Sequence, residues 1–347
     1  MLGTTDDPRL TAASISTNIL AGLCLMAEEQ GIACEHWFAG LRLSRPQVDD
    51  ASVRVSYRQA SLVIRRALRD LPAPDVGLRL GRQQSIGNFG LLGLAMMTAR
   101  TFGDAVAIGL QYSPVSGSLM DLELDTSEPG ALALVASARA PDEAILPFLC
   151  EELFASTLML CRGLVGPSFR PLRLELAYPA PAYAAEYAAL FECEVRFGMP
   201  RSRELVDPAW LPRRLPAWNP VSAQQALALC RAQMPRGPAR GEIVAAVRQL
   251  LRARLHESPG LGDVAAELHL TERTLRRQLV AAGSGFRLLH DEVRSERACE
   301  LLRGSDLPIA QVGASVGFRD AREFRRAFKR WTGKTPSAMR GGSRTGR

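Results

Sequence analysis

Arginine side chains gather at two places in the last third of this 347-residue sequence. At the first, Arg273, Arg276 and Arg277 are spaced so that a helix would carry them on one face. At the second, five cations lie within nine consecutive residues: Arg322, Arg325, Arg326, Lys329 and Arg330. Guanidinium groups at this density suit a polyanionic partner.

The net charge of the chain is concentrated in the same region. Residues 242–347 hold 20 basic and 12 acidic residues, whereas residues 1–241 hold 23 and 24. A basic module joined to a neutral one indicates a polyanion for the first and some other partner for the second. The alternative is a charged surface that meets only solvent, and the charge balance by itself does not separate the two.

The arginines occur on the second helix of two similar helix pairs. In the first pair, a helix over 262–268 breaks at His269-Leu270, and Thr271 caps the helix that follows. In the second pair, an apolar helix over 308–317 ends in glycine, and Asp320 is placed to cap the next helix. The core faces are formed by Val264, Ala265, Leu268, Leu275 and Leu279 in the first pair and by Phe324 and Phe328 in the second.

This order of elements is that of a helix-turn-helix, whose second helix enters the major groove of DNA. A long helix over 286–303 separates the two pairs. We therefore expect an all-α C-terminal domain with two recognition helices. These helices would bind major-groove segments that lie one helical turn, roughly 34 Å, apart.

Residues 242–340 resemble the DNA-binding domain of the AraC family of bacterial transcription regulators over its whole length. The resemblance is carried by Thr-Leu-Arg-Arg at 274–277, Ile309-Ala310, Gly317-Phe318, and the segment 324–333 followed by Thr335-Pro336. The sequence departs from the family at Gly313, where a small alanine-like residue is usual. Glycine inside a helix costs about 1 kcal/mol.

The resemblance implies that both second helices contact DNA. It implies base-edge contacts from Arg273, Arg276, Arg277, Arg322, Glu323 and Arg326. Arginine pairs bidentately with guanine, and glutamate can accept a hydrogen bond from cytosine. Phosphate contacts, which position a protein without reading sequence, are expected from Thr271, Arg325, Lys329, Arg330 and Arg340.

The first part of the chain is predicted to be a single α+β domain over residues 1–232. Hydrophobic periodicity predicts helices over 11–30, 56–70, 89–99, 101–112, 141–165 and 182–191, and strands over 119–124, 132–137, 172–178 and 195–197. A linker rich in proline and glycine is expected at 233–241, and a flexible tail at 341–347.

The segments 77–81, 87–93 and 190–198 resemble the arabinose-binding-type N-terminal domain of one AraC branch, over most of 12–220. That resemblance implies a domain that senses a small effector, mediates dimerisation, or does both, and it does not establish a sugar ligand. We hypothesise an apolar effector pocket, because apolar and aromatic residues are dense here and charges are few. The pocket residues would be Phe89, Leu92, Met96, Tyr112 and Phe148; the alternative is that they are simply core.

Motifs that would indicate an enzyme lack their structural context. Residues 313–317 fit G-x-S-x-G, but Ser315 lies late in a helix and not after a strand. Gly333-Lys334-Thr335 resembles the end of a phosphate-binding loop, but Phe328 stands where its first glycine should be. His36 is the only histidine in 1–232 and has no evident catalytic partner. We therefore expect no enzyme, including no enzyme fused to the DNA-binding module.

The cysteines and the apolar runs indicate a protein without metal sites, disulfides or membrane spans. The seven cysteines are scattered without a CxxC pair, so we expect neither a metal site, a cofactor nor a disulfide framework. The apolar run 19–27 is much shorter than a membrane span, and no basic leader precedes it. The expectation is a cytoplasmic protein without a membrane partner.

Together these features predict a sequence-specific transcription regulator that binds double-stranded promoter DNA. We expect a homodimer that responds to a small molecule, activates transcription and contacts RNA polymerase. The alternative is a constitutive DNA-binding protein whose first domain only dimerises.

Overall fold

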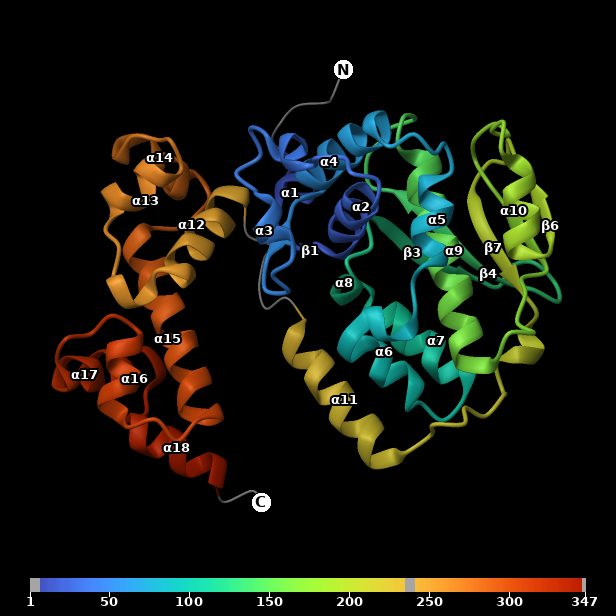
Figure 1. Cartoon of the computed structure of the whole chain (residues 1–347). Coiled ribbons are helices and arrows are strands. Elements are labelled where there is room, and N and C mark those ends of the chain that lie inside the picture. The colour runs from blue at the N-terminus through green and yellow to red at the C-terminus, as the bar shows by residue number, and fades with distance from the viewer. Residues whose placement is uncertain (1–6, 235–240, 345–347) are drawn as a thin grey trace. The chain divides into compact units, whose positions relative to one another are not determined.

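The computed structural model describes residues 7–234 and 241–344 and divides into two compact units, Met1–Ala239 and Arg240–Arg347 (Figure 1). Most of the linker predicted over 233–241 falls on 235–240, outside the described residues.

The N-terminal unit mixes helices with a five-stranded sheet, which confirms the predicted α+β class. Its α-helices are α1 (Pro8–Thr11), α2 (Asn18–Glu29), α3 (Arg45–Val48), α4 (Tyr57–Asp70), α5 (Val76–Arg82), α6 (Gly90–Met97), α7 (Phe102–Gln111), α8 (Ser113–Ser116), α9 (Leu146–Val165), α10 (Ala184–Phe191) and α11 (Pro220–Gln233). Its 3-10 helices are η1 (Glu35–Phe38), η2 (Ile86–Phe89) and η3 (Pro208–Trp210). Its strands are β1 (Ile15–Ser16), β2 (Arg54–Val55), β3 (Met120–Asp125), β4 (Leu132–Ala138), β5 (Arg173–Glu175), β6 (Glu194–Arg196) and β7 (Ser202–Val206).

The main sheet has the strand order β3-β4-β7-β5-β6, and β1 pairs with β2 apart from it. Within the described residues, β5–β6 is the only parallel pair of this sheet. Because side chains alternate along a strand, β7 directs Glu204 and Val206 to one face and Arg203 and Leu205 to the other. The first face packs toward α9, where Cys150 and Ser202 approach to 3.4 Å.

Helix α9 is the central helix of this unit, and α5 packs closely along it (Figure 1). A Cβ atom on Gly77 would lie 2.6 Å from the Cβ of Glu151, and one on Gly81 would lie 2.6 Å from the Cβ of Ala155. The glycine spacing that the sequence shows at 77–81 therefore permits this close approach of two helices.

Two of the helices predicted in this unit begin later in the chain than the sequence indicates, and some elements were not predicted. The helix predicted over 11–30 is wrong in its first third, because Ile15–Ser16 pairs with β2 and the helix begins only at Asn18. The helix predicted from 141 begins at Leu146. Strand β7 and helix α11 were not predicted, since their short or mixed apolar patterns give no clear period.

The C-terminal unit is all-α and has its own apolar core, as predicted. Its helices are α12 (Glu242–Ala253), η4 (Leu255–Glu257), α13 (Leu261–Glu267), α14 (Glu272–Ala281), α15 (Phe286–Gly304), α16 (Ile309–Ser315), α17 (Ala321–Thr332) and α18 (Pro336–Arg344). The pairs α13–α14 and α16–α17 are the two predicted helix-turn-helix units, at different levels along α15 (Figure 1). With 19 residues, α15 is about 28 Å long.

Glycines set the geometry of the second helix pair. Gly317 has φ 82°, and a Cβ there would lie 2.6 Å from the carbonyl oxygen of Leu255. Only glycine fits this turn without strain. Gly313 is buried, and a Cβ on it would lie 3.0 Å from the ring of Phe324. Glycine lowers the helix propensity of α16 at this position, but its lack of a side chain allows α16 to pack closely on α17.

The end of the chain also differs from the prediction. The backbone remains helical in α18 as far as Arg344, so the expected tail does not begin at 341; residues 345–347 lie outside the described residues. Within the described ranges, no helix is both long and apolar enough to cross a membrane.

Candidate nucleic-acid interface

The first arginine-bearing helix, α14, is held by its N-cap and by two buried leucines. The hydroxyl of Thr271 accepts a hydrogen bond from the amide of Thr274 (3.2 Å), which satisfies one of the free N–H groups at a helix start. Leu275 and Leu279 are buried in the core of the unit. The side chains that remain exposed include Arg273, Arg276 and Arg277.

The second arginine-bearing helix, α17, has the same construction. Asp320 caps it by accepting a hydrogen bond from the amide of Arg322 (2.7 Å), and Gly333 ends it in the left-handed conformation. Phe324 and Phe328 are fully buried, as the sequence predicts. The exposed side chains are Arg322, Glu323, Arg325, Arg326, Lys329 and Arg330.

A half-buried arginine contacts the turn that precedes α17. The guanidinium of Arg294, on α15, lies 4.7 Å from the ring centroid of Phe318 and donates to the hydroxyl of Ser258 (2.6 Å). Burial lowers the pKa of Arg294. Its positive charge is compensated by the cation–π contact with Phe318 and by the hydrogen bond to Ser258. The turn that precedes α17, the second of the two recognition helices, is thus fastened to α15 by Arg294.

The arginines of this unit fall into two groups according to their partners. On α12 and its C-cap, Arg248 pairs with Glu292 and Glu296, Arg252 with Glu300, and Arg254 with Glu257 and Glu267. Within the residues that the structure describes, the side chains of seven recognition-helix cations form no ion pair: Arg273, Arg276, Arg277, Arg322, Arg325, Arg326 and Lys329. These seven unpaired cations all lie on the two helices that the sequence singles out.

Three of the predicted phosphate contacts already have partners within the protein. Arg330 forms an ion pair with Asp291 (3.1 Å). Arg340 donates to the carbonyl of Leu307, and its Nε is buried. Thr271 uses its hydroxyl in the helix cap. Arg340 fastens α18 to the loop before α16, so the phosphate contact predicted for it would compete with this hydrogen bond.

A polar hollow beside α17 contains residues that sequence reasoning missed. Arg326 and Glu323 line it together with Arg287, His290 and Asp291 of α15. Burial lowers the pKa of His290 to about 4, so its ring is neutral at physiological pH. Arg287 is exposed and faces the hollow that Arg326 lines. Its spacing from His290, Asp291 and Arg294 is helical, a signal that could have placed it near the second recognition helix.

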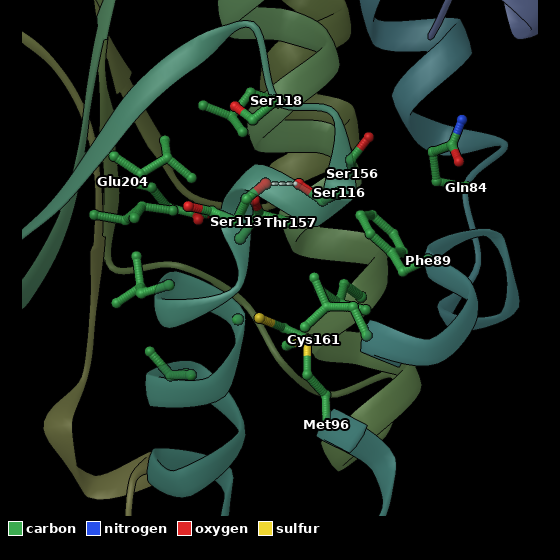
Figure 2. A pocket seen from close by; sticks show the side chains of 18 of the residues that line it. Gln84, Phe89, Met96, Ser113, Ser116, Ser118, Ser156, Thr157, Cys161 and Glu204 are labelled. Carbon is green, nitrogen blue, oxygen red and sulfur yellow. Dashed lines mark hydrogen bonds between the residues drawn. The ribbon is translucent and has the colours of Figure 1, made fainter. Parts of the chain in front are cut away.

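The N-terminal unit contains a separate, largely apolar cavity of about 160 Å³ (Figure 2). Three of the predicted pocket residues line it: Phe89, Leu92 and Met96. The structure does not bring Tyr112 and Phe148 to it. Tyr112 is buried with its hydroxyl accepting from Arg231 (3.2 Å), and Phe148 is buried where α5 packs on α9.

Sequence reasoning also missed the polar lining of this cavity. Glu152 and Glu204 reach it, together with the hydroxyls of Ser113, Ser156 and Thr157. The alternation along β7 could have shown that Glu204 shares a face with Val206, but not that this face is buried.

Groups suited to metal binding are not assembled in the described parts of the chain, where no three His, Cys, Asp or Glu side chains converge. The seven cysteines are all free thiols. The structure therefore presents two features with functional potential, an exposed cationic face on α14 and α17 and a cavity under the sheet.

Two family profiles match the chain. The profile described as the arabinose-binding domain of AraC transcription regulators, N-terminal, matches residues 31–215. A helix-turn-helix domain profile matches residues 264–342, which include both recognition helices.

Individual relatives match along nearly the whole length. An ornithine utilization regulator from Pseudomonas aeruginosa is 30% identical over 95% of this chain and 97% of its own. An uncharacterized HTH-type transcriptional regulator from Mycobacterium tuberculosis is 29% identical over 91% of this chain and 93% of its own. Among solved structures, the transcriptional regulator CdpR from P. aeruginosa is 23% identical, with a TM-score of 0.49, covering 93% of this chain and 98% of that one.

Proposed function

Since the chain belongs to the AraC family of transcriptional regulators, we propose that it reads two adjacent major-groove segments of promoter DNA with α14 and α17. The observation that carries this proposal is the division of the arginines. Cations on α12 are neutralised by glutamates, whereas those on both recognition helices are exposed and, except for Arg330, free of ion pairs within the described residues. Unneutralised arginines on two capped, rigid helices match the phosphates and base edges of a duplex.

The roles of the individual side chains follow from their positions. We assign base-edge contacts to Arg273, Arg276 and Arg277 on α14 and to Arg322, Glu323 and Arg326 on α17. Arg325 and Lys329 are assigned to phosphates, and Arg287 joins them because it lies exposed beside Arg326. Arg330 can also reach a phosphate if it exchanges Asp291 for it.

We further propose that a small molecule in the cavity of the N-terminal unit regulates DNA binding. The cavity is built under the sheet from apolar side chains with a few polar groups among them, which is the usual composition of a ligand site. A ligand changes DNA affinity only if it binds the DNA-competent state differently from the other state. In this proposal the chain acts as a cytoplasmic homodimer, activates transcription and contacts RNA polymerase, and it is not an enzyme.

The first experiment is genome-wide footprinting of the purified protein on DNA of its source organism. The same measurement is made on Arg276→Ala and Arg326→Ala, with Arg252→Ala as the control because Arg252 is paired with Glu300. We expect sites with two sequence segments about one helical turn apart, roughly 34 Å. Each recognition-helix variant should weaken the sequence preference in a different segment of the site, and the control variant should leave the preference unchanged in both. Diffuse binding without a shared sequence would overturn the proposal.

The second candidate is a constitutive DNA-binding protein whose N-terminal unit only dimerises. It predicts a footprint and an affinity that no small molecule alters. The existence of a cavity whose lining includes an unpartnered carboxyl group favours the effector-responsive function over this one.

A further inference from the structure

The cavity of the N-terminal unit has an unusual set of ionisable groups. Most of its lining is apolar and comes from α6, α7, α9 and the strands β3, β4 and β7. The acidic side chains Glu152 and Glu204 line it, and no arginine, lysine or histidine of the described residues does. An anionic ligand would therefore meet no counter-charge here, and any charged group that enters should be a cation.

Glu204 is the residue that most needs a partner. It lies in the middle of β7, opposite Leu134 of β4 and Leu174 of β5. Only 1% of its surface is exposed, and its Oε1 is buried without a hydrogen-bond partner. An unsatisfied buried polar atom costs about 1–3 kcal/mol, so such atoms usually have a use.

Other buried carboxylates of this unit are satisfied by the protein itself. Glu151 accepts hydrogen bonds from Tyr183 (2.7 Å) and Tyr187, and Glu175 accepts from Arg173 (2.7 Å) and Arg203 (2.6 Å). Glu204 differs from them because it faces the cavity. The contrast indicates that its missing partner comes from outside the protein.

The groups around Glu204 complement a small amine. Figure 2 shows Glu204 reaching from β7 toward the side of the cavity where Ser113 and Thr157 lie. Glu152, which also lines the cavity, accepts a hydrogen bond from Ser156 (2.8 Å). An ammonium group has three donors, which one carboxylate and neighbouring hydroxyl oxygens can accept. Burial raises the pKa of Glu204 to about 8. A cation bound beside the carboxyl group would lower this pKa again and favour the carboxylate.

The volume limits the rest of the ligand. A cavity of about 150 Å³ holds a molecule the size of benzene, and this one is about 160 Å³. Leu92, Met96, Phe102 and Leu160 provide apolar contacts for a short hydrocarbon body.

We propose that the cavity binds a small amine with a compact apolar body and no anionic group, whose ammonium pairs with Glu204. This inference rests on the proposed function only in taking the cavity as the effector site. Binding itself requires nothing of the DNA-contacting helices.

The test is calorimetric titration of the full chain at about pH 8 with three probes that share one hydrocarbon chain: n-hexylamine, n-hexanol and hexanoate. We expect n-hexylamine to bind about 10- to 100-fold tighter than n-hexanol, because a charge-assisted hydrogen bond is added. Hexanoate should bind weakest. Equal affinities for the amine and the alcohol, tighter binding of hexanoate, or no binding of any probe would overturn the proposal.

Variants then locate the ammonium. Glu204→Gln keeps the shape of the side chain and should lose the preference for n-hexylamine over n-hexanol. Glu186→Gln, an exposed position on α10 away from the cavity lining, is the matched control and should keep it. A preference that survives in Glu204→Gln would contradict the assignment, and the thermal unfolding of each variant shows that it is folded.

DNA binding is measured separately, so the two proposals can fail independently. If n-hexylamine binds but the footprints are diffuse, the amine-binding site is supported and the proposal of sequence-specific DNA binding is contradicted. If footprints are sharp but none of the probes binds, the ligand class falls and DNA reading stands.

Discussion

At the scale of single residues, the neighbourhood of each ionisable side chain decides its role. Arg252 and Arg276 are chemically identical, but a glutamate neutralises the first and the second is exposed without an ion pair in the described structure. Glu175 and Glu204 lie on neighbouring strands, but two arginines satisfy the first and an apolar cavity surrounds the second. The same residue type therefore serves stability in one place and is available for binding in another.

A first prediction concerns Arg276. Replacing it with alanine should weaken binding to a specific site by about 1–3 kcal/mol, or roughly 10- to 100-fold, and relax base preference at one position. Fluorescence anisotropy on the site and on its single-base variants measures both effects. Arg252→Ala should stay within about threefold of the wild type, and an equal loss in both variants would mean that only overall charge matters.

A second prediction concerns the pH dependence of stability. Burial raises the pKa of Glu204 to about 8 in the folded chain, while the unfolded carboxyl titrates at its ordinary value. Between these values the folded state binds the additional proton, so the free energy of unfolding falls as pH rises from about 5 to about 8. The nearest thiols, Cys161 and Cys193, have raised pKa values and stay neutral, and Glu152, with a pKa of about 7, adds to the same slope.

Calorimetric melting at pH 6, 7 and 8 tests this dependence. Glu204→Gln should reduce the loss of stability between pH 6 and 8 by about 1–2 kcal/mol, and Glu186→Gln should not. A steeper loss in Glu204→Gln than in the wild type would show that the sign is wrong.

At the scale of elements, caps and turns hold the recognition helices. Both helices begin at a side chain that accepts a hydrogen bond from their own first turn, and both bury two large apolar residues. The turn between α16 and α17 is the most constrained, because Gly317 has a positive φ, faces the carbonyl of Leu255 and is backed by Arg294. The direction of α17, and so of its arginines, depends on this turn.

A third prediction follows for the turn. Gly317→Ala should lower the free energy of unfolding by about 2 kcal/mol or more, since alanine is strained at this φ and its Cβ meets backbone. Gly304→Ala, at the end of α15, has open space around its Cβ and should be neutral or slightly stabilising. Chemical denaturation of both variants measures the difference, and equal stabilities would contradict the strain.

At the scale of the whole molecule, the chain combines a basic unit and a neutral unit with different features. The C-terminal unit carries the unpaired cations of α14 and α17, and the N-terminal unit carries the cavity. Affinity for DNA should therefore depend on salt, because phosphate contacts release counterions.

A fourth prediction gives this dependence a number. The plot of log affinity against log salt concentration should fall with a slope of about −0.9 for each phosphate contact. Arg325→Ala, and separately Lys329→Ala, should each make the slope about one less steep without changing base preference. Measurements at four salt concentrations on one site suffice, and a slope near zero in the wild type would refute the phosphate assignments.

The sequence by itself determined the local features of the DNA-binding unit. Apolar spacing around Leu275 and Phe324, the caps Thr271 and Asp320, and Gly317 after α16 are signals between near neighbours in the chain, which act through hydrogen bonds and periodicity within one or two turns. For the same reason the helices over 56–70 and 101–112 were predicted closely, whereas Ile15–Ser16 was placed in a helix, because its partner β2 lies 38 residues away at Arg54–Val55.

Only the tertiary structure decided which charges are free and which are used. Arg340 meets Leu307 across 33 residues, and Arg248 meets Glu296 across 48, so no local pattern distinguishes them from Arg276. The cavity arises in the same way: helices and strands far apart in sequence enclose Phe89, Met96 and Glu204 and leave Tyr112 and Phe148 in the core. Burial and pairing depend on contacts between distant segments, and these exist only once the chain has folded.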